Sequence, residues 1–283
     1  MITIWQSFCL FVFILKTQYN KRAIRRRRRL NFGFFMRYFR AVFRYALFVG
    51  ATLGLYGFWF VSRVFVPNKI FWRQTILHAW ARSFVKISNM KIEVNGVPPP
   101  PPFFLVCNHL SYTDVAALRA VVNGVFVAKG EMESWFLAGR ICRDMGTIFI
   151  NRQNRRDIPR AGTEIIRRLE LGEGVIVFPE GTSTKGETVL PFNSSFLEFA
   201  AQKDLPVSYA SITYTTPTNA PKASEAVSWW DEKTFAEHLW ELFQAREFTA
   251  IISFGDEPIH SRNRKELARQ LWEKVSERFV PVL

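Results

Sequence analysis

The first third of the chain has no acidic residue. Residues 1–92 contain 17 Lys and Arg and no Asp or Glu, whereas residues 93–283 contain 21 basic and 24 acidic residues. The net charge of +14 therefore belongs to the N-terminal third, which is also rich in apolar side chains. A nucleic-acid-binding arm is basic and polar. A segment that is basic and apolar favours an anionic membrane surface as its partner, and no nucleic acid.

Cysteine is scarce, and two well-known signatures are missing. Cys9, Cys107 and Cys142 are odd in number and form no C-x-x-C pair, which favours reduced thiols packed as small apolar side chains. No G-x-S-x-G motif occurs, and in GTSTKGE (181–187) the lysine precedes the second glycine, unlike in a P-loop. A serine hydrolase and a Walker-type nucleotide site are thereby disfavoured. A hydrolase with Cys107 as nucleophile stays open, because that thiol lies two residues before His109.

Two apolar segments precede the first acidic residue. Residues 1–15 are uncharged, lack the basic leader and cleavage site of a secretory signal, and precede a basic flank that the positive-inside rule assigns to the cytoplasm. Residues 45–62 are 18 uncharged residues between two arginines, and their basic flanks favour a helical hairpin within one leaflet over a simple span. The alternative is a buried helix of a soluble core.

These features predict the organisation of the N-terminal part. We expect an apolar and basic extension at 1–35, whose natural start could instead be Met36, and membrane-associated helices at 36–90. The expected location is a membrane, at its cytoplasmic face (the inner membrane in a bacterium).

Beyond residue 90, short apolar runs alternate with helical patterns. The pattern at 157–172 has an early proline and a closing glycine, and the one at 263–279 has a single apolar stripe. SWWDEKTFAEHLWELF (228–243) is expected to be a further helix. The alternation predicts one α/β domain at 91–283, with a mostly parallel central sheet flanked by helices. The expected strands are 91–94, 103–107, 125–128, 147–150, 175–178, 207–214 and 249–254.

A histidine and an aspartate follow the strand expected at 103–107. His109 comes directly after Asn108, and Asp114 follows five residues later. On one continuous helix the two side chains would point about 140° apart, so they can meet only if His109 lies in the turn and Asp114 in the first helical turn. The carboxylate would then hold one imidazole nitrogen and leave the other to accept a proton at neutral pH. The attacking hydroxyl would belong to the substrate. The alternative is a simple helix cap by Ser111 or Asp114.

Two other expected strands also end in polar residues. The strand at 175–178 is followed by Glu180, Gly181 and Thr182, and the strand at 147–150 delivers Arg152. An arginine at such a place suits phosphate recognition through its planar fork. Because ligands collect outside the carboxyl ends of parallel strands, these residues are expected near the histidine.

The three motifs together resemble the glycerolipid acyltransferase family, the 1-acyl-sn-glycerol-3-phosphate or lysophosphatidic acid acyltransferases. The family's N-H-x4-D motif matches Asn108 to Asp114, its strand ending in an arginine matches 146–152, and its F-P-E-G-T motif matches 178–182. VFVAKGEM (125–132) matches a further segment of the family through Lys129. The resemblance covers roughly residues 70–280.

The resemblance implies a membrane-bound enzyme that moves a fatty acyl group from an acyl thioester to the free hydroxyl of 1-acylglycerol 3-phosphate, giving phosphatidic acid. It implies that His109 is the general base and that Asp114 orients it. It implies no metal and no redox cofactor; the co-substrate is acyl-CoA or the acyl carrier protein, and the partner is a membrane lipid.

The resemblance also implies the residues that bind the acceptor. Lys129 and Arg152 bind its phosphate, and Glu180, Gly181 and Thr182 shape its pocket.

The sequence departs from the family pattern in places that bear on the acceptor. Ser183 and Thr184 stand where many members carry an arginine, 192–195 replaces a Lys-Gly pair, and LPV (205–207) lacks a second proline. Fewer cations leave another lysolipid or a glycerol-phosphate-like acceptor of the same family open. A membrane-tethered, non-enzymatic basic adaptor is the remaining alternative.

Overall fold

The computed structural model describes residues 35–151 and 157–282. The expected extension at 1–35 therefore lies almost wholly outside the described residues, and so does Arg152.

Seven strands of the described chain form one sheet in the order β1-β7-β6-β2-β5-β3-β4. Every neighbouring pair is parallel except β6 and β7, which are antiparallel. The central strands are buried on both faces, as expected of a parallel sheet covered by helices. The bounds are β1 Met90–Asn95, β2 Phe104–Cys107, β3 Gly124–Lys129, β4 Ile148–Ile150, β5 Gly174–Val177, β6 Val207–Thr215 and β7 Phe248–Phe254.

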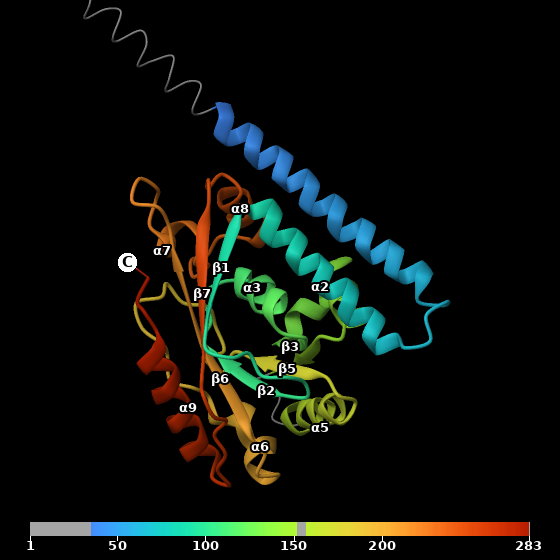
Figure 1. Ribbon diagram of the computed structural model, residues 1–283, viewed down its shortest axis with the longest axis vertical. Coiled ribbons are helices and arrows are strands. Elements are labelled where there is room, and N and C mark those ends of the chain that lie inside the picture. Colours follow the sequence, from blue (N-terminus) through green and yellow to red (C-terminus); the bar gives the residue numbers. More distant parts are fainter. Residues whose placement is uncertain (1–34, 152–156, 283) are drawn as a thin grey trace, which may run out of the picture.

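Helices cover both faces of the sheet, as Figure 1 shows. One apolar core lies between the sheet and the helices α2, α3 and α8, and a second lies between the sheet and α5, α6 and α9. The bounds are α2 Lys69–Ser88, α3 Thr113–Val121, η1 Gly130–Ser134, α4 Ala138–Asp144, α5 Asp157–Glu170, η2 Ser194–Leu197, α6 Glu198–Gln202, α7 Ala223–Ala226, α8 Phe235–Leu242 and α9 Arg264–Arg278.

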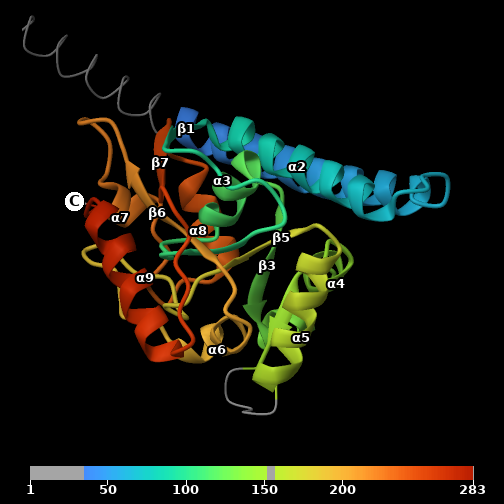
Figure 2. The same ribbon diagram turned by 60° about the horizontal axis from the view of Figure 1, so that its bottom comes forward.

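The N-terminal helix, Phe35–Ser62, lies along α2 on the outside of the domain (Figures 1 and 2). The two helices pack through Phe48 against Trp80, and the Trp80 indole donates to Thr52 at 3.0 Å. The N-terminal helix is long and apolar enough to cross a membrane, and only 6% of its most apolar window is buried. A large apolar surface is therefore open on this side of the molecule.

Arg40 and Arg44 hydrogen-bond the N-terminal helix to backbone carbonyls of the α/β domain. Arg40 donates to the carbonyl of Gln244, and Arg44 donates to the carbonyls of Ala245 and Arg246 at 2.6 and 3.1 Å. These carbonyls follow the C-terminal end of α8, where backbone acceptors lack partners inside the helix. Arg40 and Arg44 of this helix are thus hydrogen-bond donors within the protein, although they lie beside the apolar surface.

The sequence predictions of the fold are confirmed except at one helix. Each expected strand and the helices expected at 157–172 and 263–279 are present within a few residues. The helix expected over 228–243 is wrong in its first half, because α8 begins only at Phe235. Thr234 and Glu237 form a capping box, and this box fixes Phe235 as the first residue of the helix. The residues before Phe235 form a loop, and the Trp229 N–H in this loop donates to the Leu110 carbonyl, just before α3 begins.

Candidate active site

The histidine motif and the F-P-E-G-T motif lie at the carboxyl ends of two neighbouring strands. Asn108 and His109 follow β2, and Glu180 lies three residues beyond β5, which pairs with β2. Asn108 anchors this end to β6: its amide donates to the Ile212 carbonyl and accepts from the Ile212 N–H, at 2.9 and 2.7 Å. The side chain thus replaces a peptide unit in the ladder and fixes the start of the histidine loop.

His109 and Asp114 form a direct hydrogen bond. Nδ1 of His109 lies 2.8 Å from Oδ2 of Asp114, because His109 lies in the loop and Asp114 in the first turn of α3. An ionised carboxylate only accepts hydrogen bonds, so Nδ1 carries the ring proton and the lone pair of the neutral ring lies on Nε2. Among the residues that the structure describes, none bonds to Nε2, and the side chain is 22% exposed. The ring is therefore held on one side and open to a ligand on the other.

Asp114 is fully buried and saturated with donors. Its Oδ2 also accepts from the backbone N–H groups of Leu110 and Ser111, at 2.7 and 3.0 Å, and its Oδ1 accepts from the Tyr214 hydroxyl at 2.7 Å. These donors replace the hydrogen bonds to water that a buried carboxyl group loses. They also fix both oxygens, so that the imidazole has one orientation.

The F-P-E-G-T motif holds the backbone of the histidine. Oε1 of Glu180 accepts from the His109 N–H at 2.6 Å, and the N–H of Thr184 donates to the His109 carbonyl at 3.0 Å. The turn between them needs Gly181, which has a φ of +81°. The Phe178 ring stacks on the imidazole with centroids 4.2 Å apart. The second motif therefore positions the first.

Glu180 itself lies in an unusual environment. Its second oxygen accepts from the Leu190 N–H at 2.9 Å, so both oxygens are occupied by backbone donors. Burial raises the pKa of Glu180 from 4.5 to about 7; the hydrogen bonds from Leu190 and His109 oppose this shift, and the nearby charge of Asp114 adds to it. The carboxyl group thus titrates near neutrality directly under the backbone of the histidine.

The remaining candidate residues lie around this centre or outside the described part. Lys129 ends β3 and is exposed, Thr182 is exposed in the turn, and Gly181 is partly buried. The backbone of β3 reaches the same edge of the sheet as β2 and β5, which places Lys129 at the histidine end. Arg152, expected to bind phosphate, lies outside the described residues.

An apolar cavity of about 340 Å³ opens beside the histidine loop. Its lining residues come mainly from the N-terminal helix, α2, α3, β3 and α4, and they include Tyr112, Phe126 and Trp229. Phe126 stacks on Phe178, which in turn stacks on the imidazole. A cavity of this size and lining falls within the range of about 300–1,000 Å³ typical of small-ligand sites. It is suited to a hydrocarbon chain.

Cys107 is not placed to act as a nucleophile. The side chain is fully buried, and burial, followed by the charges of Asp114 and Glu180, raises the pKa of its thiol well above the usual range. A thiol reacts as its thiolate, so this cysteine is inert at neutral pH. This weakens the cysteine-hydrolase alternative.

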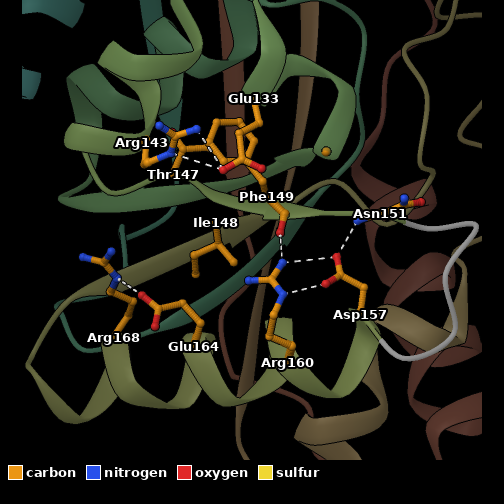
Figure 3. A pocket seen from close by; sticks show the side chains of 11 residues that line it. Glu133, Arg143, Thr147, Ile148, Phe149, Asn151, Asp157, Arg160, Glu164 and Arg168 are labelled. Carbon is orange, nitrogen blue, oxygen red and sulfur yellow. Dashed lines mark hydrogen bonds and ion pairs between the residues drawn. The ribbon is translucent and has the colours of Figure 1, made fainter.

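A second pocket, polar and about 540 Å³ in volume, lies over β4 and α5 (Figure 3). Arg160 donates to the Phe149 carbonyl of β4 at 2.5 Å and pairs with Asp157, whose carboxylate accepts from the Asn151 N–H at 2.6 Å. Glu133 pairs with Arg143 at 3.0 Å on the opposite wall. The charges of this pocket are thus paired with one another and close the edge of the sheet, so we assign no anion site to it.

The described residues include no group of three or more His, Cys, Asp and Glu side chains arranged to hold a metal ion.

Comparisons with known proteins agree with this geometry. The model of a family described as Acyltransferase matches residues 91–213. A lyso-ornithine lipid O-acyltransferase of Pseudomonas aeruginosa is 30% identical over 72% of this chain and 78% of its own length. The chain belongs to the glycerolipid acyltransferase family. A 1-acyl-sn-glycerol-3-phosphate acyltransferase of Neisseria meningitidis is 27% identical over 61% of this chain and 68% of its own length.

The fold of this acyltransferase is also that of a solved structure. The crystal structure of the 1-acyl-sn-glycerophosphate acyltransferase from Thermotoga maritima superposes with a TM-score of 0.63 at 19% identity, covering 87% of this chain and 97% of the other. The relatives act, by their names, on two different lysolipids. The chain is thus an acyltransferase of the lysolipid family, and its open apolar helix together with these relatives indicates association with a membrane.

Sequence reasoning missed three side chains that build the centre of this acyltransferase. Asn108 and Phe178 entered only as members of motifs, with no role of their own, and Tyr214 only as a residue of an expected strand. One signal was available for Tyr214: a tyrosine in a buried strand needs a partner for its hydroxyl. No signal in the sequence gave the identity of that partner.

Proposed function

We propose that the protein transfers a fatty acyl group from an acyl thioester to the free hydroxyl of a lysolipid, with 1-acylglycerol 3-phosphate as acceptor and phosphatidic acid as product. The observation that carries the proposal is the hydrogen bond of 2.8 Å between Nδ1 of His109 and the buried Asp114, which leaves Nε2 without a partner among the described residues. In the reaction, Nε2 takes the proton of the lipid hydroxyl as its oxygen attacks the thioester carbon. The thiolate leaves, and the imidazolium returns a proton to it.

The negative charge of Asp114 stabilises the imidazolium formed in this step. The carboxylate is fully buried and fixed by four donors, so it needs no rearrangement when the ring becomes charged. The acyl chain would lie in the apolar cavity beside Phe126 and Trp229. Lys129 at the end of β3, together with Arg152, would hold the acceptor phosphate, while Glu180, Gly181 and Thr182 form the turn beside it. The co-substrate would be acyl-CoA or acyl carrier protein.

The open face of the N-terminal helix would lie in the lipid, at the cytoplasmic face of the membrane. This helix contributes Phe48, Thr52 and Leu55 to the cavity wall. The cavity would therefore border the lipid phase, from which both the acceptor and its product exchange. A basic and apolar N-terminal third favours an anionic surface of this kind.

A panel of acceptors tests the proposal. Purified full-length protein in lipid vesicles is offered an acyl thioester with 1-acylglycerol 3-phosphate, lyso-ornithine lipid, 1-acylglycerol 3-phosphocholine, glycerol 3-phosphate or no acceptor. The expected result is release of thiol matched by phosphatidic acid, and none without an acceptor. Equal thiol release without an acceptor would show a thioesterase instead. Running each acceptor with acyl-CoA and with acyl carrier protein identifies the donor.

A second acceptor is favoured by one feature of the site. Ser183 and Thr184 follow the F-P-E-G-T motif where many family members have an arginine, and the Ser183 hydroxyl donates to the Trp229 carbonyl. A site with fewer cations suits a headgroup that is an amino acid, as in lyso-ornithine lipid. The same panel of acceptors distinguishes the two lysolipids, because the acceptor with the higher kcat/KM is the substrate. If kcat/KM is tenfold or more higher with lyso-ornithine lipid, the product is the acylated ornithine lipid and not phosphatidic acid.

A further inference from the structure

Tyr214 lies on β6, outside every motif, yet its hydroxyl reaches the carboxylate behind the histidine. The distance from the Tyr214 oxygen to Oδ1 of Asp114 is 2.7 Å, and both side chains are almost completely buried. Oδ1 is the oxygen that does not bond to the imidazole. The phenol therefore sits on the far side of the carboxylate from His109.

The direction of this hydrogen bond is fixed by its neighbours. The Thr113 hydroxyl also contacts the Tyr214 oxygen, at 2.9 Å. Because an ionised carboxylate cannot donate, Tyr214 must give its one proton to Asp114 and accept the proton of Thr113. Burial, followed by the charge of Asp114, raises the pKa of Tyr214 well above its usual value, so the phenol keeps its proton at any pH at which the enzyme works.

We propose that Tyr214 is a positioning residue that sets the proton affinity of the His109 base by donating to the far oxygen of Asp114, with Thr113 completing a relay of hydroxyl groups. The inference deepens the proposed function and rests on the base role of His109 within it. The hydroxyl neutralises part of the carboxylate charge. Without it, Asp114 would hold the proton of the imidazolium more tightly, and a higher pH would be needed to free the base. Glu180, the other carboxyl group beside His109, bonds to its backbone N–H and titrates in the same pH range, so only the difference between variant and wild type is assigned to Tyr214.

The test replaces only the hydroxyl. Tyr214→Phe keeps the ring and its edge contact with Phe248. Tyr209→Phe makes the same change on the same strand, but Tyr209 faces the core on the other side of the sheet. We measure kcat/KM for the lysolipid against pH with the full chain in vesicles. For Tyr214→Phe we expect about a tenfold loss near neutral pH, the size of one hydrogen bond to a charged group, and an acid limb moved to higher pH.

The control and a double mutant separate positioning from simple folding damage. Tyr209→Phe keeps the wild-type profile. Thr113→Val moves the acid limb in the same direction by a smaller amount and has no further effect in the Tyr214→Phe background, because its hydroxyl acts only through the phenol. A Tyr214→Phe profile identical to wild type, or a lower rate with an unmoved acid limb, overturns the proposal.

A second readout does not need activity. The chain has four histidines, so the His109 signal can be assigned by its loss in His109→Ala and followed by NMR during a pH titration. Tyr214→Phe should move the midpoint of that titration to higher pH, and Tyr209→Phe should leave it in place. A midpoint of the His109 titration that does not move overturns the inference about Tyr214. A wild-type protein that is inactive with every acceptor counts against the proposed function alone, because the titration is measured without activity.

Discussion

Two histidine–aspartate pairs in the part of the chain that the structure describes differ in their surroundings. His109 and Asp114 are 2.8 Å apart, with side chains 22% and 0% exposed, whereas His260 and Asp204 are 3.3 Å apart and 65% and 35% exposed. Both pairs use Nδ1 of the ring. The chemical groups are the same, so any difference in function must come from what lies around them.

The two carboxylates differ in the groups, other than the histidine, that donate hydrogen bonds to them. Asp114 accepts from two backbone N–H groups and a phenol, all fixed by the fold. Asp204 accepts from the guanidinium of Arg262, which is 85% exposed, and the hydrogen bond from His260, then that from Arg262, lowers the pKa of Asp204. Pairs between exposed groups contribute little, because water and salt screen them. A buried, fixed carboxylate and an open ring nitrogen therefore distinguish the His109 pair, the proposed catalytic base, from the exposed His260 pair.

The largest expected effect comes from removing each ring. His109→Ala should lower kcat/KM by about 10⁴-fold, because it removes the proposed general base. His260→Ala should change it less than about twofold, because that ring lies in solvent. Thiol release and ester formation are measured with protein of equal vesicle binding. A His109→Ala enzyme that keeps a tenth of the wild-type rate would end the comparison.

The next effect comes from neutralising each carboxylate. Asp114→Asn should cost about 10²–10³-fold in kcat/KM, because an amide cannot accept all the donors around Asp114 and lets the ring take the wrong tautomer. Asp204→Asn, the same change at the exposed pair, should have no effect on rate. The measurement is the rate at saturating acceptor, and equal losses at the two positions would contradict the account.

A smaller effect concerns the cavity beside the buried pair. Ala128 lines the cavity and is only partly buried, so Ala128→Leu should shorten the space for an acyl chain without overfilling a closed core. We expect the ratio of kcat/KM for long over short acyl thioesters to fall about tenfold. The ratio is its own control, since loss of folded protein lowers both rates equally. An unchanged ratio would show that the acyl chain lies elsewhere.

The smallest effect concerns the carboxyl group under the histidine backbone. Folding raises the pKa of Glu180 from 4.5 to about 7, so the folded protein holds this proton more tightly than the unfolded chain. The stability that Glu180 contributes is therefore complete below about pH 4.5 and is lost as the pH rises through about 7. Glu180→Gln does not titrate. The free energy of unfolding of wild type minus variant should fall by roughly 1 kcal/mol per pH unit at most over this window.

Denaturant unfolding in detergent at several pH values measures this difference. The matched control is Glu187→Gln, at an exposed residue of the same loop, for which the difference should stay flat. A flat difference for Glu180 as well would show that its environment does not favour the protonated form.

The fold was predictable because its strands are short apolar runs between helical patterns. The uninterrupted apolar sequences FLVC and GVIV predict that all four residues of β2 and of β5 are buried, and they are. The helix start at Phe235 was not predictable from the apolar pattern, because Trp229 before it packs on Tyr112 from a loop and not from a helix. In a short aromatic segment, the apolar pattern of a buried loop cannot be distinguished from that of a helix.

The site was predictable only as far as motifs reach. The spacing of His109 and Asp114 required the loop-and-helix arrangement that is present. The contacts of Glu180 with the His109 backbone and of Tyr214 with Asp114 join residues 71 and 100 positions apart. Contacts of this range depend on strand order, which a single sequence does not specify. For the same reason the cavity, lined by residues of many separate elements, left no local pattern.

The central claim is that the His109–Asp114 pair activates a hydroxyl supplied by the lipid. The most direct test offers the wild-type protein an acyl thioester with either the preferred lysolipid or its deoxy analogue, which has hydrogen in place of the free hydroxyl. The account predicts that thiol release occurs with the lysolipid and stays at background with the analogue. Equal release with both would mean that water or a residue of the protein attacks the thioester, and would contradict the account.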